Sequence, residues 1–179
     1  MLGRRNVYLI GPMGSGKTAV GRRLATLLGI EFIDSDAEIE KRTGVDVRYI
    51  FEKEGEARFR ERERDVIADL TALEGVVIAT GGGVILDPAN RERLAKTGTV
   101  VYLETTVDTL VRRTKSTKTR PLLMNDDPRA VLERLMVTRR PLYEQTADLR
   151  VETTGRQVRA VALDIQQRLA HRVAKPSSS

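Results

Sequence analysis

A glycine-rich segment near the N-terminus constrains the fold of this chain more than any other feature. Residues 11–18, GPMGSGKT, match the pattern GxxxxGK[ST] and directly follow the apolar run 7–10. The next segment, residues 17–28, carries apolar side chains at helical spacing. A strand, a glycine turn and a helix in this order predict a phosphate-binding loop, because the loop N–H groups and the helix N-terminus converge on an anion.

The loop predicts a site for ATP or GTP. Lys17 would reach the β- and γ-phosphates, and Thr18 would offer its hydroxyl to Mg²⁺. Consecutive residues of the loop and the first helical turn are expected to contact the nucleotide: Gly14, Ser15, Gly16, Lys17, Thr18 and Ala19.

Short β-branched runs alternate with longer segments of helical period along the rest of the chain. This alternation predicts the α/β class, with a five-stranded, mainly parallel sheet covered by helices on both faces. The expected strands are 7–10, 31–33, 76–79, 99–103 and 149–151. Helices are expected at 17–28 and 56–73, and from about residues 36, 87, 107, 128 and 157. The length of 179 residues suits a single domain, expected at 1–173, with a disordered tail at 174–179.

The composition excludes several classes of function. The chain has no cysteine and one histidine, so disulfides, a cysteine nucleophile, a zinc site and a histidine-based triad are not expected. No apolar run reaches the roughly 18 residues that span a bilayer, which favours a cytoplasmic protein without a membrane partner. The net charge is +6 and most basic residues are arginines, which favours anionic ligands. Aromatic residues are too few for us to expect nucleic-acid binding.

Two aspartates follow the second expected strand. The strand 76–79 ends in TGGG without a carboxylate, so an acid that helps to bind the metal must come from elsewhere. Asp34 and Asp36 would emerge at the carboxyl edge of the sheet, where open α/β sheets bind ligands. We expect Asp34 to bind the hydration shell of Mg²⁺ and Asp36 to bind an acceptor hydroxyl. A plain helix N-cap is the alternative role of Asp36.

Three glycines and two arginines are further candidates for the acceptor site. Residues 81–83 are all glycine, which would let a substrate approach backbone N–H groups closely, although a flexible turn is the alternative. Within the helical segment 56–73, Arg60 and Arg62 flank the apolar stripe on opposite sides. The spacing does not choose between the two arginines.

In this order, these segments resemble the shikimate kinases, and the resemblance runs to about Arg156. It rests on the loop at 11–18, DSD at 34–36, GEARFRERE at 55–63, GGG at 81–83, RPLL at 120–123 and RRPLY at 139–143. The resemblance implies a three-layer P-loop kinase fold like that of nucleoside monophosphate kinases, with a five-stranded parallel sheet. It also implies a substrate-binding region at about 34–61 and a mobile lid at about 115–127.

The implied reaction transfers the γ-phosphate of ATP to the 3-hydroxyl of shikimate. The products are shikimate 3-phosphate and ADP, on the route to chorismate and the aromatic amino acids. The resemblance further implies one Mg²⁺ per subunit, shikimate and ATP as the small-molecule partners, and a monomer.

The resemblance also assigns residues to roles. Lys17, Asp36 and Arg120 would be catalytic. Arg113 and Arg156 would flank adenine, and Arg120 would also contact the nucleotide. The residues implied to bind shikimate are Asp36, Arg60, Gly81, Gly82, Gly83 and Arg139. For Arg139, a surface ion pair near the end of its helix is the alternative.

Two other functions are compatible with the same loop. A gluconate or nucleoside monophosphate kinase would keep Lys17 and Thr18 but would not need arginines arranged for a carboxylate beside a glycine turn. A nucleotide-binding module without catalytic activity would draw instead on the basic charge of the chain.

Overall fold

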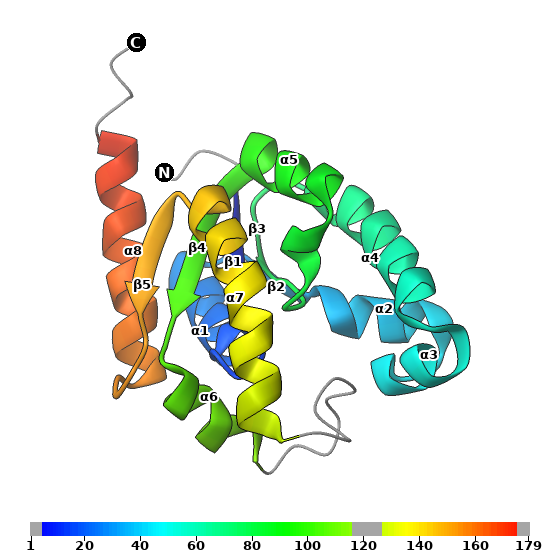
Figure 1. Ribbon diagram of the computed structural model, residues 1–179. Coiled ribbons are helices and arrows are strands. Elements are labelled where there is room, and N and C mark those ends of the chain that lie inside the picture. The colour runs from blue at the N-terminus through cyan, green and yellow to red at the C-terminus, as the bar shows by residue number, and fades with distance from the viewer. Residues whose placement is uncertain (1–4, 116–126, 175–179) are drawn as a thin grey trace.

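The computed structural model describes residues 5–115 and 127–174, and its centre is a five-stranded parallel sheet (Figure 1). The strand order is β2-β3-β1-β4-β5, and every neighbouring pair is parallel. The strands are β1 (Asn6–Ile10), β2 (Glu31–Asp34), β3 (Val76–Ala79), β4 (Gly98–Glu104) and β5 (Leu149–Glu152). The expected α/β fold with five parallel strands is therefore confirmed.

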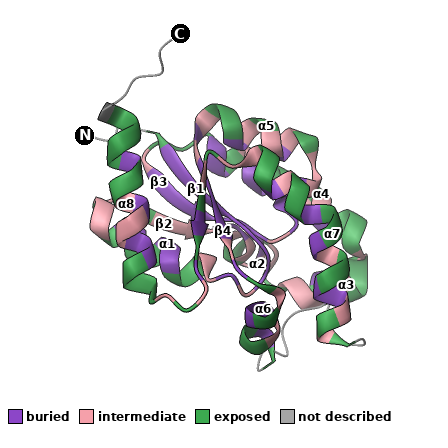
Figure 2. Cartoon of the chain, turned by 60° about the vertical axis from the view of Figure 1, so that its left-hand side comes forward, coloured by how far each residue is buried: buried purple, intermediate pink, exposed green. Residues whose placement is uncertain are grey.

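Helices cover both faces of the sheet. One face carries α1 (Lys17–Leu28) and α8 (Val158–Ala174), which pack against each other. The other elements are α2 (Ser35–Thr43), α3 (Val47–Glu54), α4 (Glu56–Thr71), the 3₁₀ turn η1 (Val84–Leu86), α5 (Pro88–Thr97), α6 (Val107–Thr114) and α7 (Pro128–Thr146). Figure 2 shows the result: buried strands lie in the centre, and the outer sides of the helices are exposed.

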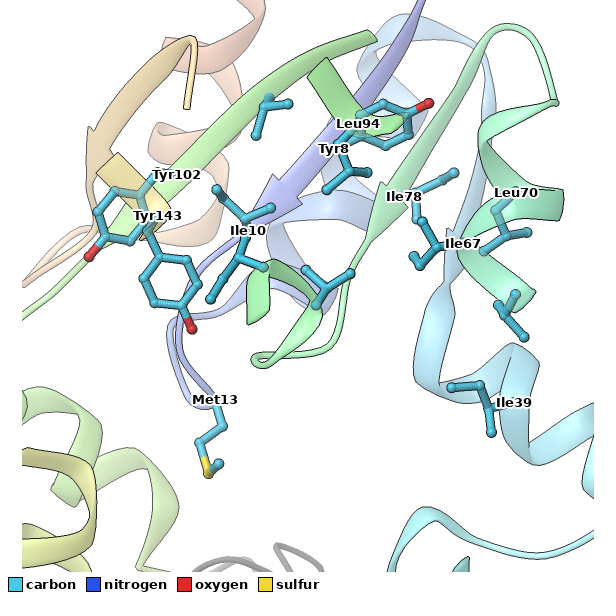
Figure 3. Close-up of a cluster of buried hydrophobic side chains, with 14 of the residues drawn as sticks. Tyr8, Ile10, Met13, Ile39, Ile67, Leu70, Ile78, Leu94, Tyr102 and Tyr143 are labelled. Carbon is cyan, nitrogen blue, oxygen red and sulfur yellow. The ribbon is translucent and has the colours of Figure 1, made fainter. Parts of the chain in front are cut away.

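Alternate residues of the central strands supply two separate apolar cores. Val7 and Leu9 of β1 face the layer of α1 and α8. Tyr8 and Ile10 face the opposite layer, where Ile78 and side chains of α4 and α5 join them (Figure 3). A parallel sheet that is buried on both faces needs apolar side chains at every position of its central strands, which explains the unbroken apolar runs in the sequence.

The switch in connection direction between β1 and β3 creates the crevice for the site. After β1 the chain enters α1 on one face, whereas after β3 it continues through η1 into α5 on the other face. The two loops therefore diverge at the carboxyl edge of adjacent strands, which is where open parallel sheets bind ligands. These two loops are the glycine-rich loop at 11–18 and the triglycine turn at 81–83.

Several boundaries differ from the sequence expectation. The short helix α3 was not expected as a separate element, although Asp46 caps it by accepting a hydrogen bond from the Tyr49 N–H. The helix expected at 56–73 ends at Thr71, and Leu73, the last residue of that expected helix, lies beyond its end and is 42% exposed. Arg120 lies outside the described residues, as do nearly all of the expected lid and the expected tail. None of the helices in the described ranges is long and apolar enough to cross a membrane.

Candidate active site

One cavity at the carboxyl edge of the sheet brings most of the predicted site residues together. Its volume is about 370 Å³. Its lining comes from the glycine-rich loop, the end of β2 and the turn after β3: Gly14, Gly16, Lys17, Thr18, Ala19, Asp34, Asp36, Thr80, Gly81 and Gly82. Segments that are up to about 70 residues apart in the sequence thus share one site.

The glycine-rich loop has the backbone that its glycines predict. Gly11, Gly14 and Gly16 have φ angles of 147°, 80° and 95°, which other residues rarely adopt. A Cβ on Gly11 would lie 2.9 Å from the Leu103 carbonyl oxygen, so the close packing of the loop also requires glycine there. The Lys17 ammonium donates to the carbonyl oxygens of Gly11 (2.6 Å) and Pro12 (2.8 Å), which holds its charge over the loop.

Asp34 joins the loop to the start of α2. Its Oδ2 accepts a 2.8 Å hydrogen bond from the Thr18 hydroxyl, and its Oδ1 accepts from the backbone N–H groups of Asp36 and Ala37. Asp34 is therefore the N-cap of α2, and the alternative that Asp36 is the cap is wrong. Asp36 lies in the first helical turn, where its carboxylate reaches the triglycine turn.

Each glycine of that turn is closely approached by a different charged side chain. A Cβ on Gly81 would lie 2.7 Å from Asp36 Oδ1 and 2.9 Å from Glu63 Oε2. A Cβ on Gly82 would lie 3.6 Å from Arg139 Nη1, and one on Gly83 would overlap the Arg60 guanidinium. None of the three has a positive φ, so close approach is what selects glycine at Gly81 and Gly83, whereas a Cβ on Gly82 would come no nearer than 3.3 Å, to the Met13 nitrogen. Two carboxylates and two guanidinium groups converge on three consecutive residues.

The backbone N–H groups of the turn are not equivalent. Gly81 N–H donates to Ser35 Oγ at 3.1 Å, so it is already paired. The N–H groups of Gly82 and Gly83 donate to no other residue in the ranges 5–115 and 127–174. Two donors of this turn therefore remain for a ligand.

The structure distinguishes Arg60 from Arg62, which their spacing in the sequence could not. Arg60 pairs with Glu63 at 2.9 Å and with Glu56 at 3.3 Å, and its guanidinium lies against Gly83. Arg62 instead makes two 2.9 Å hydrogen bonds with Glu54 of α3.

Glu63 is a site residue that the sequence interpretation missed. Its side chain is 1% exposed, and burial raises the pKa of its carboxyl, although the neighbouring Arg60 and Arg139 oppose this shift. Its Oε2 makes no hydrogen bond within the described chain. The sequence contained a signal for its burial. Glu63 lies four residues after Phe59 and three before Val66, so a charged residue occupies a position within the apolar stripe of α4.

Arg139 approaches the turn from α7. The residue is only 5% exposed, so the alternative of a surface ion pair is wrong. The helix continues through Pro141, one turn before its end at Thr146. One turn after Arg139, the Tyr143 hydroxyl donates to the Gly82 carbonyl oxygen at 2.5 Å.

A second cavity of about 360 Å³ lies on the α6 side of the glycine-rich loop. It is lined by Thr109, Arg112, Arg113, Gly155 and Arg156. Arg113 donates to the Gly14 carbonyl oxygen at 3.1 Å, which connects this cavity to the phosphate loop. Arg156 is held by the Glu152 carbonyl oxygen at 2.9 Å and by Asp164 at 3.1 Å. The two arginines expected to flank adenine thus line the same cavity.

Comparison with known proteins identifies the family. The family model described as shikimate kinase matches residues 13–170. The chain belongs to the shikimate kinase family. A shikimate kinase of Pseudoalteromonas atlantica (strain T6c / ATCC BAA-1087) is 53% identical over 169 residues, which cover 94% of this chain and 99% of the relative. The relative from Halorhodospira halophila (strain DSM 244 / SL1), also a shikimate kinase, is 55% identical and covers 91% of this chain and 92% of its own.

Solved shikimate kinases agree with this assignment. The enzyme from Acinetobacter baumannii, in complex with shikimate, has a TM-score of 0.93 and 48% identity, and the match covers 96% of each chain. A gluconokinase from Sinorhizobium meliloti 1021 has a TM-score of 0.61 at 17% identity, with 98% of each chain covered. That second likeness shows the fold alone.

Family membership decides between the functions that the sequence left open. As a shikimate kinase, the protein transfers the γ-phosphate of ATP to the 3-hydroxyl of shikimate, on the route to chorismate and the aromatic amino acids. The expected activity is thereby confirmed, whereas the gluconate kinase, the nucleoside monophosphate kinase and the non-catalytic module are not supported.

Proposed function

We propose that shikimate binds at the triglycine turn with its carboxylate between Arg60 and Arg139. One observation carries this proposal: two helices bring a guanidinium each to neighbouring glycines, Gly82 and Gly83, whose N–H groups donate to no other described residue. Guanidinium groups bind carboxylates by charge-assisted and often paired hydrogen bonds. Gly81 serves mainly to admit the Asp36 carboxylate, because its own N–H is paired with Ser35.

Asp36 binds the acceptor hydroxyl and takes its proton. Its carboxylate lies in the cavity that also holds Lys17 and the phosphate loop. The hydroxyl oxygen attacks the γ-phosphorus, the bond from that phosphorus to the β-γ bridging oxygen breaks, and ADP leaves. Placed charge does most of the work in such a transfer, since little covalent help is needed.

The nucleotide extends from the first cavity to the second, along the glycine-rich loop. The backbone from Gly14 to Ala19 binds its phosphates, and Lys17 stabilises the negative charge on the transferring group. Arg113 and Arg156 flank adenine in the second cavity. Arg120, outside the described residues, is proposed to act on the phosphates together with Lys17.

The Thr18 hydroxyl and the Asp34 carboxylate suit one Mg²⁺ per subunit. Both are hard oxygen donors, they lie 2.8 Å apart, and they border the phosphate loop. Mg²⁺ commonly takes one or two protein oxygens and completes its shell with water and substrate phosphates. When bound, the ion would neutralise charge on the β- and γ-phosphates.

The remaining parts of the proposal concern the organisation of the chain. A single kinase domain at 1–173 contains a substrate region at about 34–61, whereas nearly all of the expected lid at about 115–127 and of the expected tail at 174–179 lies outside the described residues. The enzyme acts as a cytoplasmic monomer without nucleic-acid or membrane partners. These proposals rest on the sequence composition and on the resemblance to the family.

A coupled assay of ADP release tests the acceptor and the metal together. Shikimate, quinate, gluconate and AMP are offered as acceptors at saturating ATP, with Mg²⁺ or with EDTA. We expect release with shikimate alone, and only when Mg²⁺ is present. Equal turnover in EDTA would contradict the metal site, and turnover with AMP or gluconate but not shikimate would contradict the acceptor site.

A further inference from the structure

All three carbonyl oxygens of the triglycine turn accept a hydrogen bond. The carbonyl oxygens of Gly81 and Gly83 accept from Val84 N–H and Leu86 N–H, both at 3.1 Å. These are local turn bonds. The Gly82 carbonyl oxygen accepts from the Tyr143 hydroxyl of α7 at 2.5 Å, a contact between residues 61 positions apart.

The bond from Tyr143 fixes the orientation of one peptide group. The Gly82 carbonyl and the Gly83 N–H belong to the same peptide, and the described residues contain no cis peptide bond. In a trans peptide these two groups point in opposite directions. The hydroxyl that holds the carbonyl therefore aims the Gly83 N–H to the other side. Glycine has few steric limits on its backbone angles, so this peptide would rotate easily without that bond.

Tyr143 is well suited to hold a peptide in place. Its side chain is fully buried, and its ring stacks on Tyr102 with centroids 5.1 Å apart and an interplanar angle of 22°. Figure 3 shows the two rings side by side, with their hydroxyl oxygens at separate points. Burial raises the pKa of the Tyr143 phenol far above its usual value, although Arg139 opposes the shift. The phenol is therefore neutral and keeps the proton that it donates.

We infer that Tyr143 is a positioning residue for the acceptor, whose hydroxyl orients the Gly82–Gly83 peptide so that the Gly83 N–H faces the shikimate carboxylate beside Arg60. Arg139 lies one helical turn before Tyr143, so the same side of α7 delivers both a guanidinium and a hydroxyl to Gly82. A hydrogen bond to a peptide carbonyl also strengthens the N–H of that peptide as a donor. The inference rests on the proposed acceptor site.

The test is Tyr143→Phe in the full-length enzyme, which removes one hydroxyl and keeps the ring. A neutral hydrogen bond is worth about tenfold in binding, so we expect the KM for shikimate to rise about tenfold. The KM for ATP and the affinity for ADP should change by less than about twofold, because the phosphate loop is untouched. A shikimate KM within about twofold of the parent value in a folded variant would overturn the inference.

Two tyrosines provide matched controls. Tyr8→Phe also removes a buried hydroxyl, which bonds with Asn6 and Thr97 at the opposite end of the sheet. Tyr102→Phe changes the stacked partner, whose hydroxyl bonds to no other residue that the structure describes. Both should keep the shikimate KM. A rise in either variant that equals the rise in Tyr143→Phe would assign the effect to core packing and overturn the inference.

Two further variants keep the test decisive if Tyr143→Phe does not fold. Tyr143→4-aminophenylalanine keeps a donor at the para position, whereas Tyr143→4-methylphenylalanine does not. Calorimetry should find tighter shikimate binding to the first and equal ADP binding to both, and equal shikimate binding would overturn the inference. Parent-like shikimate KM values in Arg60→Ala and Arg139→Ala would instead overturn the acceptor site, and this inference with it.

Discussion

Two arginines on α4 point to different surroundings, and their roles differ accordingly. Arg60 is 18% exposed in its side chain and lies against Gly83 of the triglycine turn. Arg62 is more exposed and binds Glu54, which raises the pKa of the Arg62 guanidinium and stabilises the contact between α3 and α4. The direction of a side chain, rather than its residue type, is therefore the reason that we propose Arg60 and not Arg62 for the acceptor site.

Replacing Arg60 therefore separates acceptor binding from nucleotide binding. Arg60→Ala should weaken shikimate binding by about 2–4 kcal/mol, because it removes a charge-assisted contact to a carboxylate, and should leave ATP binding unchanged. Calorimetric titration of each ligand measures both. Arg62→Ala is the matched control and should lower the melting temperature only slightly, as expected for an exposed ion pair. If Arg62 proves the sensitive position, the assignment of the acceptor site to Arg60 is wrong.

Asp36 and Asp46 allow a comparison between the aspartate that we propose to react and a structural one. Asp36→Asn should lower kcat by about 10²-fold or more, because the variant cannot take the hydroxyl proton. Asp46→Asn changes only the N-cap of α3 and should lower the melting temperature slightly while keeping kcat. Steady-state rates and thermal melts of both variants distinguish the roles. A parent-like kcat in Asp36→Asn would remove Asp36 from the reaction.

The triglycine turn has no side chains of its own, and charged side chains from neighbouring helices occupy the space this leaves. Gly83 has a φ of −99°, so alanine causes no backbone strain there, and the added Cβ meets the far end of the Arg60 side chain. Gly83→Ala should therefore displace Arg60, raise the shikimate KM about tenfold or more, and hardly change the melting temperature. Enzyme kinetics and a thermal melt measure this.

Gly44→Ala gives the opposite pattern and serves as the control. Gly44 has a φ of +74° with open space around its Cα, so alanine is strained there but clashes with nothing. We expect a loss of about 1 kcal/mol in stability and an unchanged shikimate KM. Equal kinetic effects of the two substitutions would show that the turn tolerates side chains and that close approach is not what selects glycine.

The elements that could be predicted are those whose signals are local. β3 and α1 have the expected bounds, because a β-branched run between turns and a motif with a fixed helix start define them. The helix α3 was missed because its eight residues carry too short a pattern to stand apart from α2 and α4. Contacts between elements could not be predicted, because the sequence pattern of one element does not show which residues of another element it meets. Spacing along one helix says nothing of Gly83, Glu54 or the direction in which Tyr143 points.

The fold as a whole places charged side chains of both signs together beside the triglycine turn, in a region that is largely buried from water. Arg139 and Glu63 are both nearly buried, and Arg60 lies between α4 and the glycine turn. Even a paired charge loses hydration on burial that its partner only partly replaces, so this arrangement should reduce stability while it prepares the anion site proposed above. Such a cost should be visible as a dependence of stability on pH.

Glu63 makes that cost measurable. Its folded-state pKa is raised, chiefly by burial, above the ordinary value of 4.5 that holds in the unfolded chain. Between these two pKa values the folded state binds more protons than the unfolded state, so the parent protein loses stability as the pH rises through this window. A glutamine in place of Glu63 does not titrate. The free energy of unfolding of Glu63→Gln minus that of the parent should therefore increase with pH across the window and then stay constant.

Glu54 provides a control of opposite sign on the neighbouring helix. Arg62 lowers the pKa of the Glu54 carboxyl, so this group stabilises the fold at neutral pH and loses its contribution as the pH falls through the lowered pKa. Glu54→Gln should therefore be less stable than the parent at neutral pH, and the difference should shrink in acid. Urea unfolding of the parent and both variants between about pH 2 and pH 8 measures the two slopes. If the Glu63→Gln difference falls with rising pH, Glu63 is stabilised as a carboxylate by Arg60 and Arg139, and the cost assigned to its burial is wrong.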